Sequence, residues 1–344
     1  MNTRNPVDKL WALGAILLSI HSIQAAELEG FIMTVRGPVP VADLGKTLSH
    51  EHVLVDFIGA EESGYHRWDR DEVISVMLPR LVAVKDLGYQ SLFECTPAFL
   101  GRDPRLLRKL SELSEVNLIT NTGYYGARQN QFIPEKIQDW PINELVDKWI
   151  QEFELGIEDT GIRPGFLKIG VDREDKLSAM HEKLIRAVCR VHLATGLTIA
   201  SHTGPSPVVF QITQILKEEG VDPSAFIWVH ATRDNSENQI RAAKIGMWVS
   251  IDNLRENANL LRANVDRIVA LKEAGLLNRV LISQDAGWYR PGEENGGAIA
   301  PFTFVEQSLV PALIKAGFED HEVDQLLVQN PAHAYSIRVR RLPR

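Results

Sequence analysis

Two histidines separated by one residue lie in an apolar-flanked run near the start of the chain. The run Thr47–Val55 contains His50 and His52, with Glu51 between them. Side chains on a β-strand alternate between two faces, so both imidazoles would point the same way. Two imidazoles on one face favour metal coordination over core packing. The alternative is a pair of ordinary surface or core histidines, because a single His-x-His motif is only modestly specific.

Further residues with metal-binding chemistry recur at the ends of later apolar segments. Lys168 lies in an otherwise apolar run, and His202, His230 and Asp285 each end another run. Taken singly, each has an ordinary explanation, such as a hydrogen-bonded core histidine, a lysine that reaches water or a turn-forming aspartate. All of them fall at the same end of their runs, which favours one shared site. Four histidines and one carboxylate exceed what a single tetrahedral zinc ion needs.

The runs that carry these residues alternate with segments of helical spacing, many of which are closed by glycine. The β-like runs cover residues 48–53, 91–96, 117–123, 165–169, 197–201, 226–229, 247–251 and 279–283. Continuous apolar strands with intervening helices predict a parallel sheet that is covered on both faces. Eight such units in about 240 residues favour an α/β fold of the closed (β/α)₈ type, the TIM barrel. A doubly wound sheet is the alternative, but no phosphate-binding glycine motif follows the first strand.

In a (β/α)₈ barrel the C-terminal ends of the strands meet at one rim, where active sites lie. The predicted fold therefore brings the candidate ligands together, although they are spread along the chain. No linker or low-complexity segment splits residues 26–344, which predicts a single domain. The segment 302–337 reads as one or two closing helices.

Composition limits the classes of partner. The chain has 344 residues and a formal net charge of −8, with no basic block. Nucleic acids and anionic membrane surfaces are therefore not expected as partners. Only two cysteines are present, Cys95 and Cys189, and they are predicted to be buried free thiols rather than part of a disulfide framework.

The N-terminus has the pattern of a secretory signal. Arg4 and Lys9 precede the apolar run Leu10–Leu18, and small residues follow at Ala25–Ala26. This order predicts a cleavable signal peptide over residues 1–25 and a periplasmic or secreted protein, with no membrane attachment after cleavage. An uncleaved anchor is the alternative, although the run is shorter than the ~20 residues that span a bilayer.

The motifs taken in order resemble the phosphotriesterase family of the amidohydrolase superfamily. The matching segments are Thr34–Pro38, Thr47–His52, Gly101–Asp103, Gly156–Gly161, Ser201–Thr203, Ser283–Asp285 and Asn330–Ala332. The resemblance covers nearly the whole chain after the signal. It implies a binuclear metal-dependent hydrolase with two divalent ions, zinc first, with manganese or cobalt as alternatives because His and carboxylate ligands discriminate poorly. It also suggests a homodimer.

The same resemblance implies a role for each candidate ligand. His50, His52 and Asp285 would hold a buried ion. His202 and His230 would hold a more exposed one. A hydroxide between the ions would attack an ester-like centre, and Asp285 would take the proton.

By the same resemblance, Lys168 would be an N6-carboxylysine that bridges both ions. A lysine is cationic and cannot coordinate a metal as it stands. In an apolar strand beside cations its pKa should fall, and the neutral amine can then take up CO₂. A protonated Lys168 with a purely structural role is the alternative.

The sequence departs from the phosphotriesterases proper in the region that relays the proton. Those enzymes carry histidine after the aspartate of strand seven, whereas Asn253 follows Asp252 here. Arg233 stands where the relay calls for a carboxylate, with Asp234 as a substitute. Lactonase-like members tend to carry arginine after the strand-seven aspartate, and Arg255 could serve from a shifted position.

The residues expected around the substrate also resemble those of the lactonase-like members. Tyr124 and Tyr125 stand where lactonase-like members place a substrate-orienting tyrosine, and Trp288 is expected to line the leaving-group pocket. Glu94 is interpreted as structural. The predicted substrate is a small ester-like molecule, either a phosphotriester or a lactone or carboxylic ester, and phosphotriesterase activity could be incidental to a lactonase. The alternative from another class is an exported metal-binding protein without catalysis.

Overall fold

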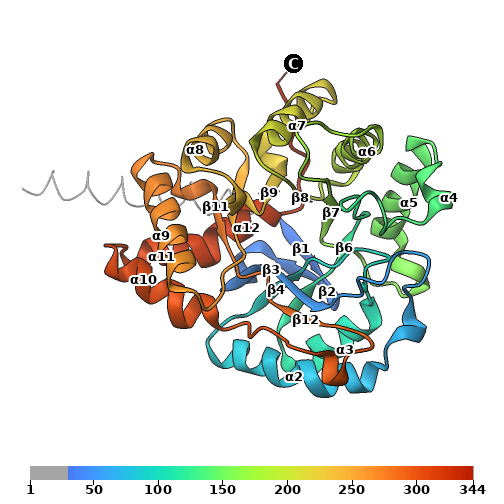
Figure 1. Cartoon of the computed structure of the whole chain (residues 1–344), viewed down its shortest axis with the longest axis horizontal. Coiled ribbons are helices and arrows are strands. Elements are labelled where there is room, and N and C mark those ends of the chain that lie inside the picture. The colour runs from blue at the N-terminus through green and yellow to red at the C-terminus, as the bar shows by residue number, and fades with distance from the viewer. Residues whose placement is uncertain (1–29, 344) are drawn as a thin grey trace, which may run out of the picture.

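The computed structural model describes residues 30–343. Figure 1 shows strands at the centre of the molecule with helices arranged around them. The predicted signal peptide lies outside the described residues, so its presence and the export that it implies stay predictions. Among residues 30–343, no helix has both the length and the apolar character needed to cross a bilayer.

Parallel strands form the centre of the fold. They are β3 (Thr47–Leu54), β4 (Ser91–Glu94), β5 (Asn117–Ile119), β6 (Asn121–Thr122), β7 (Phe166–Gly170), β8 (Ile199–His202), β9 (Phe226–Val229), β10 (Trp248–Ile251), β11 (Val280–Ile282) and β12 (Gly287–Tyr289). One sheet runs β6-β7-β8-β9-β10-β11 and another runs β12-β3-β4-β5. Only Thr120 separates β5 from β6, so these two pieces occupy one strand position.

Hydrogen bonds between the first and last strand positions close the sheet into a barrel. The backbone N–H of Asp285 donates to the carbonyl of His50 at 3.2 Å, and that of His52 donates to Ala286 at 3.0 Å. Beyond this point β12 pairs in parallel with β3. Counting β5 with β6 and β11 with β12 gives eight positions, as predicted. The predicted (β/α)₈ barrel is confirmed.

Helices connect the strands and cover the outside of the barrel (Figure 1). The principal ones are α2 (Arg70–Asp86), α3 (Pro104–Ser114), α5 (Ile142–Leu155), α6 (Ala179–Thr195), α7 (Ser206–Glu218), α8 (Ser236–Lys244) and α9 (Ala258–Glu273), with the short α4 (Glu135–Gln138). Side-chain caps begin several of them; Asp103, for example, accepts from the backbone N–H of Leu106 at 3.1 Å.

The C-terminal segment forms two continuous helical stretches, residues 304–315 and 320–335, as predicted. They comprise α10 (Val310–Lys315), α11 (Asp320–Asp324) and α12 (Asn330–Tyr335), with π-helical turns at Val305–Leu309 and Gln325–Gln329. Pro311 and Pro331 follow these two turns, and neither can donate the N–H that an α-helix needs there. Each proline therefore disturbs the helical ladder locally without ending the helix.

A hydrophobic layer inside the barrel includes residues from both termini of the described chain. The hairpin of β1 (Phe31–Thr34) and β2 (Gly37–Pro40) contributes Ile32, which belongs to one buried cluster with Phe93, Phe166 and Tyr335. The ring of Tyr335 stacks on that of Phe93 at 3.7 Å. The polar residues described below therefore converge above an apolar floor.

His192 on α6 links the closing segment to the barrel and makes folding sensitive to pH. Its Nδ1 donates to the carbonyl of Leu197 at 2.8 Å, and its Nε2 accepts from the backbone N–H of Arg340 at 2.9 Å. The ring is fully buried, and burial lowers the pKa of His192 to about 4. The unfolded chain takes up this proton near pH 6.5, well before the folded chain does. Stability should therefore fall as pH decreases from about 6.5 to 4, by at most about 3 kcal/mol.

We expect His192→Gln to reduce this pH dependence. The measurement is urea unfolding of the metal-loaded wild type and variant at about pH 7 and pH 5, compared as the change in the free energy of unfolding. His321→Gln is the matched control, because His321 is exposed on α11. Equal pH dependence in the wild type and His192→Gln would contradict the assignment.

Candidate metal centre

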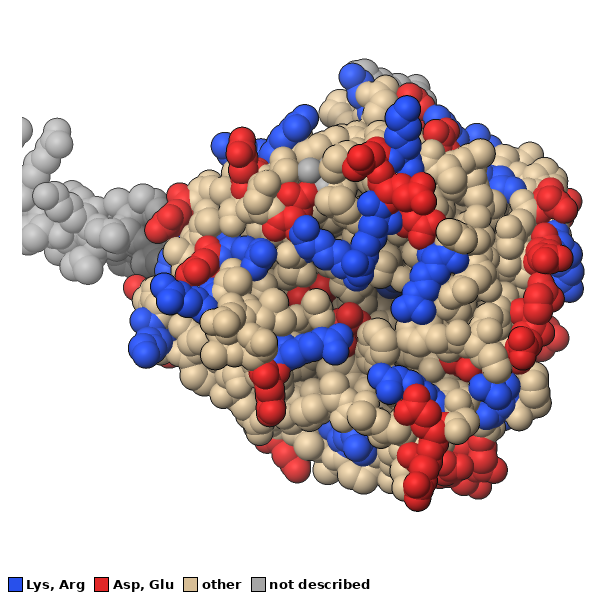
Figure 2. All heavy atoms as spheres, in the orientation of Figure 1, with Lys and Arg blue, Asp and Glu red and all other residues tan. Residues whose placement is uncertain are grey.

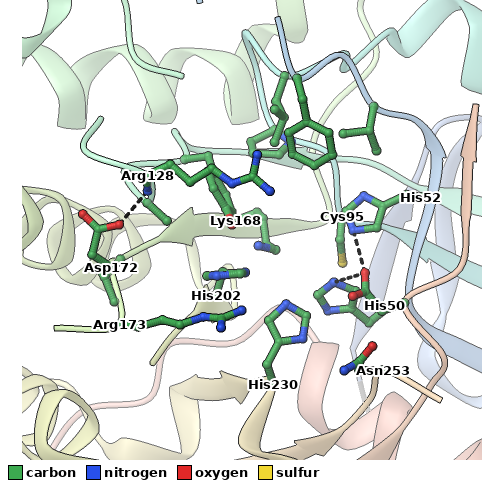
Figure 3. Close-up of a pocket in the computed structure, with 18 of the residues that line it drawn as sticks. His50, His52, Cys95, Arg128, Lys168, Asp172, Arg173, His202, His230 and Asn253 are labelled. Carbon is green, nitrogen blue, oxygen red and sulfur yellow. Dashed lines mark hydrogen bonds and ion pairs between the residues drawn. The ribbon is translucent and has the colours of Figure 1, made fainter. Parts of the chain in front are cut away.

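A cavity of about 840 Å³ lies at the C-terminal ends of the barrel strands. Figure 3 shows histidines from several strands directed into it, with Lys168 between them. The structure brings these predicted site residues into its lining: His50, His52, Tyr125, Lys168, His202, His230, Asn253, Arg255, Asp285 and Trp288. Segments more than 200 residues apart in the chain thus share one wall, because the barrel places all strand ends at one rim.

The tightest part of the site is formed by His50, His52 and Asp285. One ligand atom from each lies within 4.8 Å of the others. Oδ1 of Asp285 is 3.2 Å from Nε2 of His52 and 3.7 Å from Nε2 of His50. This carboxylate oxygen is buried and accepts no hydrogen bond among the described residues. Burial also lowers the pKa of His50 well below its ordinary value, so the ring is neutral and has a lone pair to donate.

The orientation of His52 is fixed from behind by Thr96. The hydroxyl of Thr96 donates to the Glu94 carboxylate at 2.5 Å, which leaves it able only to accept from Nδ1 of His52, 2.8 Å away. The proton of His52 therefore lies on Nδ1, and the lone pair on Nε2 faces Asp285. Glu94 has the structural role that was expected of it, and it acts through Thr96. Such outer contacts commonly fix metal-binding histidines.

His230 is oriented in a similar way by Asp252. Nδ1 of His230 donates to the Asp252 carboxylate at 2.6 Å, and the backbone N–H of His230 donates to the same group at 3.0 Å. Ser250 donates to it as well. Although burial favours the protonated acid, the charge and hydrogen bond of His230 hold the pKa of Asp252 below its ordinary value. Nε2 of His230 is thereby left to face the cavity.

His202 lies beside His230, with ring centroids 4.6 Å apart. Its Nε2 accepts a hydrogen bond from the Arg233 guanidinium at 3.0 Å. Burial is the main cause that lowers the pKa of His202 well below its ordinary value, with the neighbouring cationic groups adding to it. The ring is therefore neutral and available as a ligand once Arg233 moves aside.

Lys168 is buried on β7 at the centre of this group. Its Nζ donates to the carbonyl of Ile169 at 3.3 Å and lies 5.4 Å from the Tyr125 ring. Burial lowers the pKa of Lys168. Partial loss of the proton is the condition that reaction with CO₂ requires, so the environment suits carboxylation.

Glu51 is a supporting residue whose role the sequence analysis did not identify. It lies between the two histidines of β3 and its side chain points the other way. Its carboxylate accepts from Ser283 Oγ at 2.6 Å and from the backbone N–H groups of Gln284 and Ala286 at 3.1 and 2.7 Å. Burial raises the pKa of Glu51 to about 8. These bonds fix the turn that carries Asp285; a charged residue inside an apolar strand was the signal that could have revealed it.

Three residues that follow strands have left-handed backbone conformations. His230, Asn253 and Asp285 have φ values of 62°, 65° and 55°. Non-glycine residues in this region each cost on the order of 1 kcal/mol or more, and such residues are common at functional sites. The conformation turns each side chain out of the strand direction and over the cavity.

Some of the residues predicted around the substrate line the cavity, and Tyr124 does not. Tyr125 lies 5.0 Å from the His202 ring, and Trp288 lies 5.5 Å from the His52 ring. Tyr124 does not line this cavity, although it was expected to do so. It packs against Trp149 at 5.2 Å and lines a separate cavity of about 330 Å³. Successive residues at the strand end point in opposite directions, so only one of the two tyrosines can face the site.

Asp234, the expected substitute in the proton relay, is engaged elsewhere. Its carboxylate accepts from the side-chain amide of Asn238 at 3.0 Å and from the backbone of Asn235 at 2.7 Å. It does not line the cavity, whereas Arg233 and Asn253 do. Asp234 therefore lies apart from the predicted ligands, whereas Asp285 lies among them.

The donor set fits divalent cations. Neutral imidazoles and carboxylates are the ligands that zinc, manganese and cobalt use in proteins. The unpartnered Oδ1 of Asp285 directed at two imidazole nitrogens would be costly if it had no positive partner. The rings of His50 and His230, 5.2 Å apart, connect this part of the site with His202. His50, His52 and Asp285 therefore form a candidate metal-binding group, and His202, His230 and Lys168 line the same cavity beside it.

Comparisons with known proteins give one consistent family. A family model described as the phosphotriesterase family matches residues 30–335. A phosphotriesterase homology protein of Escherichia coli (strain K12) is 28% identical, over 85% of this chain and 98% of its own. An aryldialkylphosphatase of Saccharolobus solfataricus is 26% identical, over 86% and 96%. An N-acetyltaurine hydrolase of Xenopus tropicalis is 23% identical, over 89% and 98%.

A solved structure has the same fold. The organophosphorus hydrolase from Deinococcus radiodurans superposes with a TM-score of 0.80 at 24% sequence identity, covering 89% of this chain and 97% of that one. Identity at this level bears on the fold alone.

Proposed function

Because this chain belongs to the phosphotriesterase family, we propose that it is a metal-dependent hydrolase with two divalent ions, zinc first, held at the C-terminal rim of its barrel. The first ion is bound by His50, His52 and Asp285. The second is bound by His202 and His230. The substrate is a small molecule with an ester-like centre.

The observation that carries this proposal is the cluster of His50, His52 and Asp285, with ligand atoms within 4.8 Å and one carboxylate oxygen unpartnered. Thr96 fixes the proton of His52, and Asp252 fixes that of His230, on the ring nitrogen that faces away from the cavity. A group of this kind is costly to assemble for structural reasons alone, since it buries polar atoms that lack hydrogen bonds.

We further propose that Lys168 is carboxylated and bridges the two ions. In support, its amine is buried beside the histidines and its pKa is lowered by that burial. As a carbamate it would be an anion with two oxygens, which could serve both ions. This conversion also removes a positive charge from a site that must accept two cations.

Divalent ions held by these residues would supply Lewis-acid polarisation of a P=O or C=O bond and would make water a stronger nucleophile at neutral pH. The remaining roles are performed by side chains of the protein. Asp285 presents Oδ1 to the reacting centre and takes the proton of the attacking water. Trp288 donates from its indole N–H to the backbone carbonyl of Asp285 at 3.1 Å and holds the turn in place. Tyr125 forms the wall beside His202.

The scissile bond that we propose is that of a phosphotriester, a lactone or a carboxylic ester. The names of the relatives differ in substrate, with a phosphatase and an amide hydrolase at similar identity. A lactonase is the second candidate, favoured by Tyr125, which lies over the metal ligands where an orienting tyrosine would act. In that case any phosphotriesterase activity is incidental.

The test is kcat/KM of the zinc-loaded mature protein on paraoxon and on a set of γ- and δ-lactones, before and after removal of metal with a chelator. We expect turnover that depends on metal, with restoration by added zinc. A preference of orders of magnitude for lactones would identify a lactonase. Tight metal binding without turnover of phosphotriester, lactone, aryl ester or N-acyl amide would instead support a non-catalytic metal-binding protein.

Two further proposals come from the sequence. The N-terminal pattern supports export to the periplasm or beyond, and family resemblance supports a homodimer. Cell fractionation and light scattering of the mature protein test them.

A further inference from the structure

Four arginines line the outer part of the cavity: Arg128, Arg173, Arg233 and Arg255. They come from the loops after β6, β7, β9 and β10, so four separate segments direct positive charge at one space. Only Asp172 and Glu174 provide carboxylates in the same outer wall. The whole chain has a net charge of −8, which makes this local excess of positive charge the reverse of the overall balance. Figure 2 shows Lys and Arg side chains gathered around a hollow near the middle of the viewed face.

None of the four guanidinium groups forms an ion pair within the described part of the chain. Asp172, which could neutralise one of them, instead accepts from the backbone N–H groups of Arg128 and Gln129 at 2.6 and 3.2 Å. The Arg128 side chain lies over the Phe57 ring at 4.6 Å. Arg255 donates to the neutral amide of Asn253 at 3.0 Å. The wall therefore has an excess of positive charge, with four guanidinium groups against the two carboxylates of Asp172 and Glu174.

Arg233 is the arginine nearest to the metal ligands. It is half-buried, and its guanidinium reaches Nε2 of His202. A neutral imidazole nitrogen has a single lone pair, so Nε2 of His202 cannot accept from Arg233 and coordinate an ion at once. Coordination through Nδ1 puts the remaining proton on Nε2, which likewise removes the acceptor. Either mode frees the Arg233 guanidinium for another partner between the metal ligands and the rim.

Arg173 approaches the same region from the opposite loop. Figure 3 shows its side chain extending toward His202 from the segment that follows β7. Arg173 and Arg233 line the same part of the cavity, and after burial the charge of Arg173 is the next cause that lowers the pKa of Arg233. A half-buried guanidinium at Arg233 with the exposed guanidinium of Arg173 near it favours an anion between them, because guanidinium forks match the oxygens of carboxylate, sulfonate and phosphate groups.

We propose that the physiological substrate carries a negatively charged oxyanion group, which Arg233 and Arg173 bind while the scissile bond lies at the metal ligands. This inference rests on the proposed hydrolase function and names its substrate class: small anionic esters, lactones or amides. Neutral phosphotriesters and unsubstituted lactones lack the group that the arginines recognise. Such compounds would be held only at the scissile bond, with no anionic group for Arg233 and Arg173 to bind.

The experiment uses two substrates with the same scissile bond and different charge. Mono-4-nitrophenyl adipate has a free carboxylate, and 4-nitrophenyl adipamate replaces that carboxylate with an isosteric carboxamide. On the zinc-loaded protein we expect kcat/KM to be roughly 10- to 100-fold higher for the charged ester, as a charge-assisted contact provides. The preference should shrink as salt is added. It should be lost in Arg233→Gln and reduced in Arg173→Gln, with most of the change in KM.

A binding measurement keeps the inference independent of turnover. Calorimetric titration with adipamate and with the neutral adipamide should give a preference of similar size for the anion, again lost in Arg233→Gln. Arg108→Gln is the control, because Arg108 is exposed on α3 and pairs with Glu112. If Arg233→Gln does not fold, the exposed Arg173 provides the second variant.

The outcomes separate the two proposals. Metal-dependent hydrolysis of both esters at equal kcat/KM, with equal affinity for adipamate and adipamide, would leave the hydrolase standing and overturn the anionic substrate. Hydrolysis of neither ester together with selective binding of adipamate would overturn the ester hydrolase and retain the arginine site.

Discussion

Asp285→Asn is expected to lower kcat/KM by roughly 10²- to 10⁴-fold, the range of a lost general base. Asparagine keeps the shape of the side chain, yet it has no charge and accepts no proton near neutral pH. Burial alone would raise the pKa of Asp285, but the imidazoles around it hold that pKa below its ordinary value, so the group is an anion in the native site. Its loss removes both the proton acceptor and one negative ligand of the first ion.

The measurement is single-substrate kinetics with the best substrate of the panel, together with metal content by mass spectrometry. Asp234→Asn is the comparison, because Asp234 follows the metal-ligand histidine of β9 and was the other candidate for the relay. Its carboxylate is held by Asn238 outside the cavity, so an effect below about tenfold is expected. If Asp234→Asn costs as much as Asp285→Asn, the proton leaves by another route than the one proposed.

Lys168→Ala is expected to remove metal and activity together. The substitution deletes the buried amine that lies between the histidines (Figure 3), and on carboxylation this group would be the anion shared by both ions. Without it, His202 and His230 remain as a pair of neutral ligands, which is too few for tight binding of a divalent ion. We expect loss of about half the bound metal or more and a fall in kcat/KM on the order of 10³-fold.

Two observations separate a bridging role from a structural one. Wild-type protein reconstituted with zinc in CO₂-free buffer should recover activity slowly, and bicarbonate should accelerate it. Small carboxylic acids such as propionate should restore part of the activity of Lys168→Ala, because they fit the space that the side chain leaves. Lys176→Ala is the control, since Lys176 is exposed in the loop after β7. Normal metal content in Lys168→Ala would exclude the bridge.

Much of the fold could be predicted because the barrel repeats one local pattern. Each apolar run from Leu48 to Ser283 is followed by residues with helical spacing, and that alternation needs no knowledge of distant contacts. The closing helices were predicted as well, but the π-helical turns that precede Pro311 and Pro331 were not. The segment takes its course from packing under the barrel, as Tyr335 does on Phe93.

The ligand residues were found for a related reason. His202, His230 and Asp285 end their strands, so the topology alone carries them to one rim. The direction in which each side chain points at the rim could not be predicted in the same way. The choice between Tyr124 and Tyr125 depends on the exact register at the strand end, and one residue reverses the side chain.

The supporting contacts were beyond sequence reasoning because they join segments far apart in the chain. Thr96 acts on His52 only because β4 lies beside β3. Glu51 reaches Ser283, 232 residues away. The arginines of the cavity wall stand in four loops, and nothing in any single loop indicates that the others face the same space. Charge that is dispersed in sequence becomes a site only when the barrel closes.

The closure of the barrel between β3 and the turn at Asp285 has a consequence for how the protein matures. His50 is among the first of the described residues to be synthesised and Asp285 follows 235 positions later, and their backbones meet at the seam. The binding pocket for the buried ion therefore does not exist in any nascent fragment that ends before Asp285, and its formation is a long-range, slow kind of folding step. An ion captured there ties the seam shut, so metal affinity and resistance to unfolding should rise together. These ligands select weakly among divalent metals. The metal that is bound should therefore depend on which ions are available in the compartment where the chain completes folding.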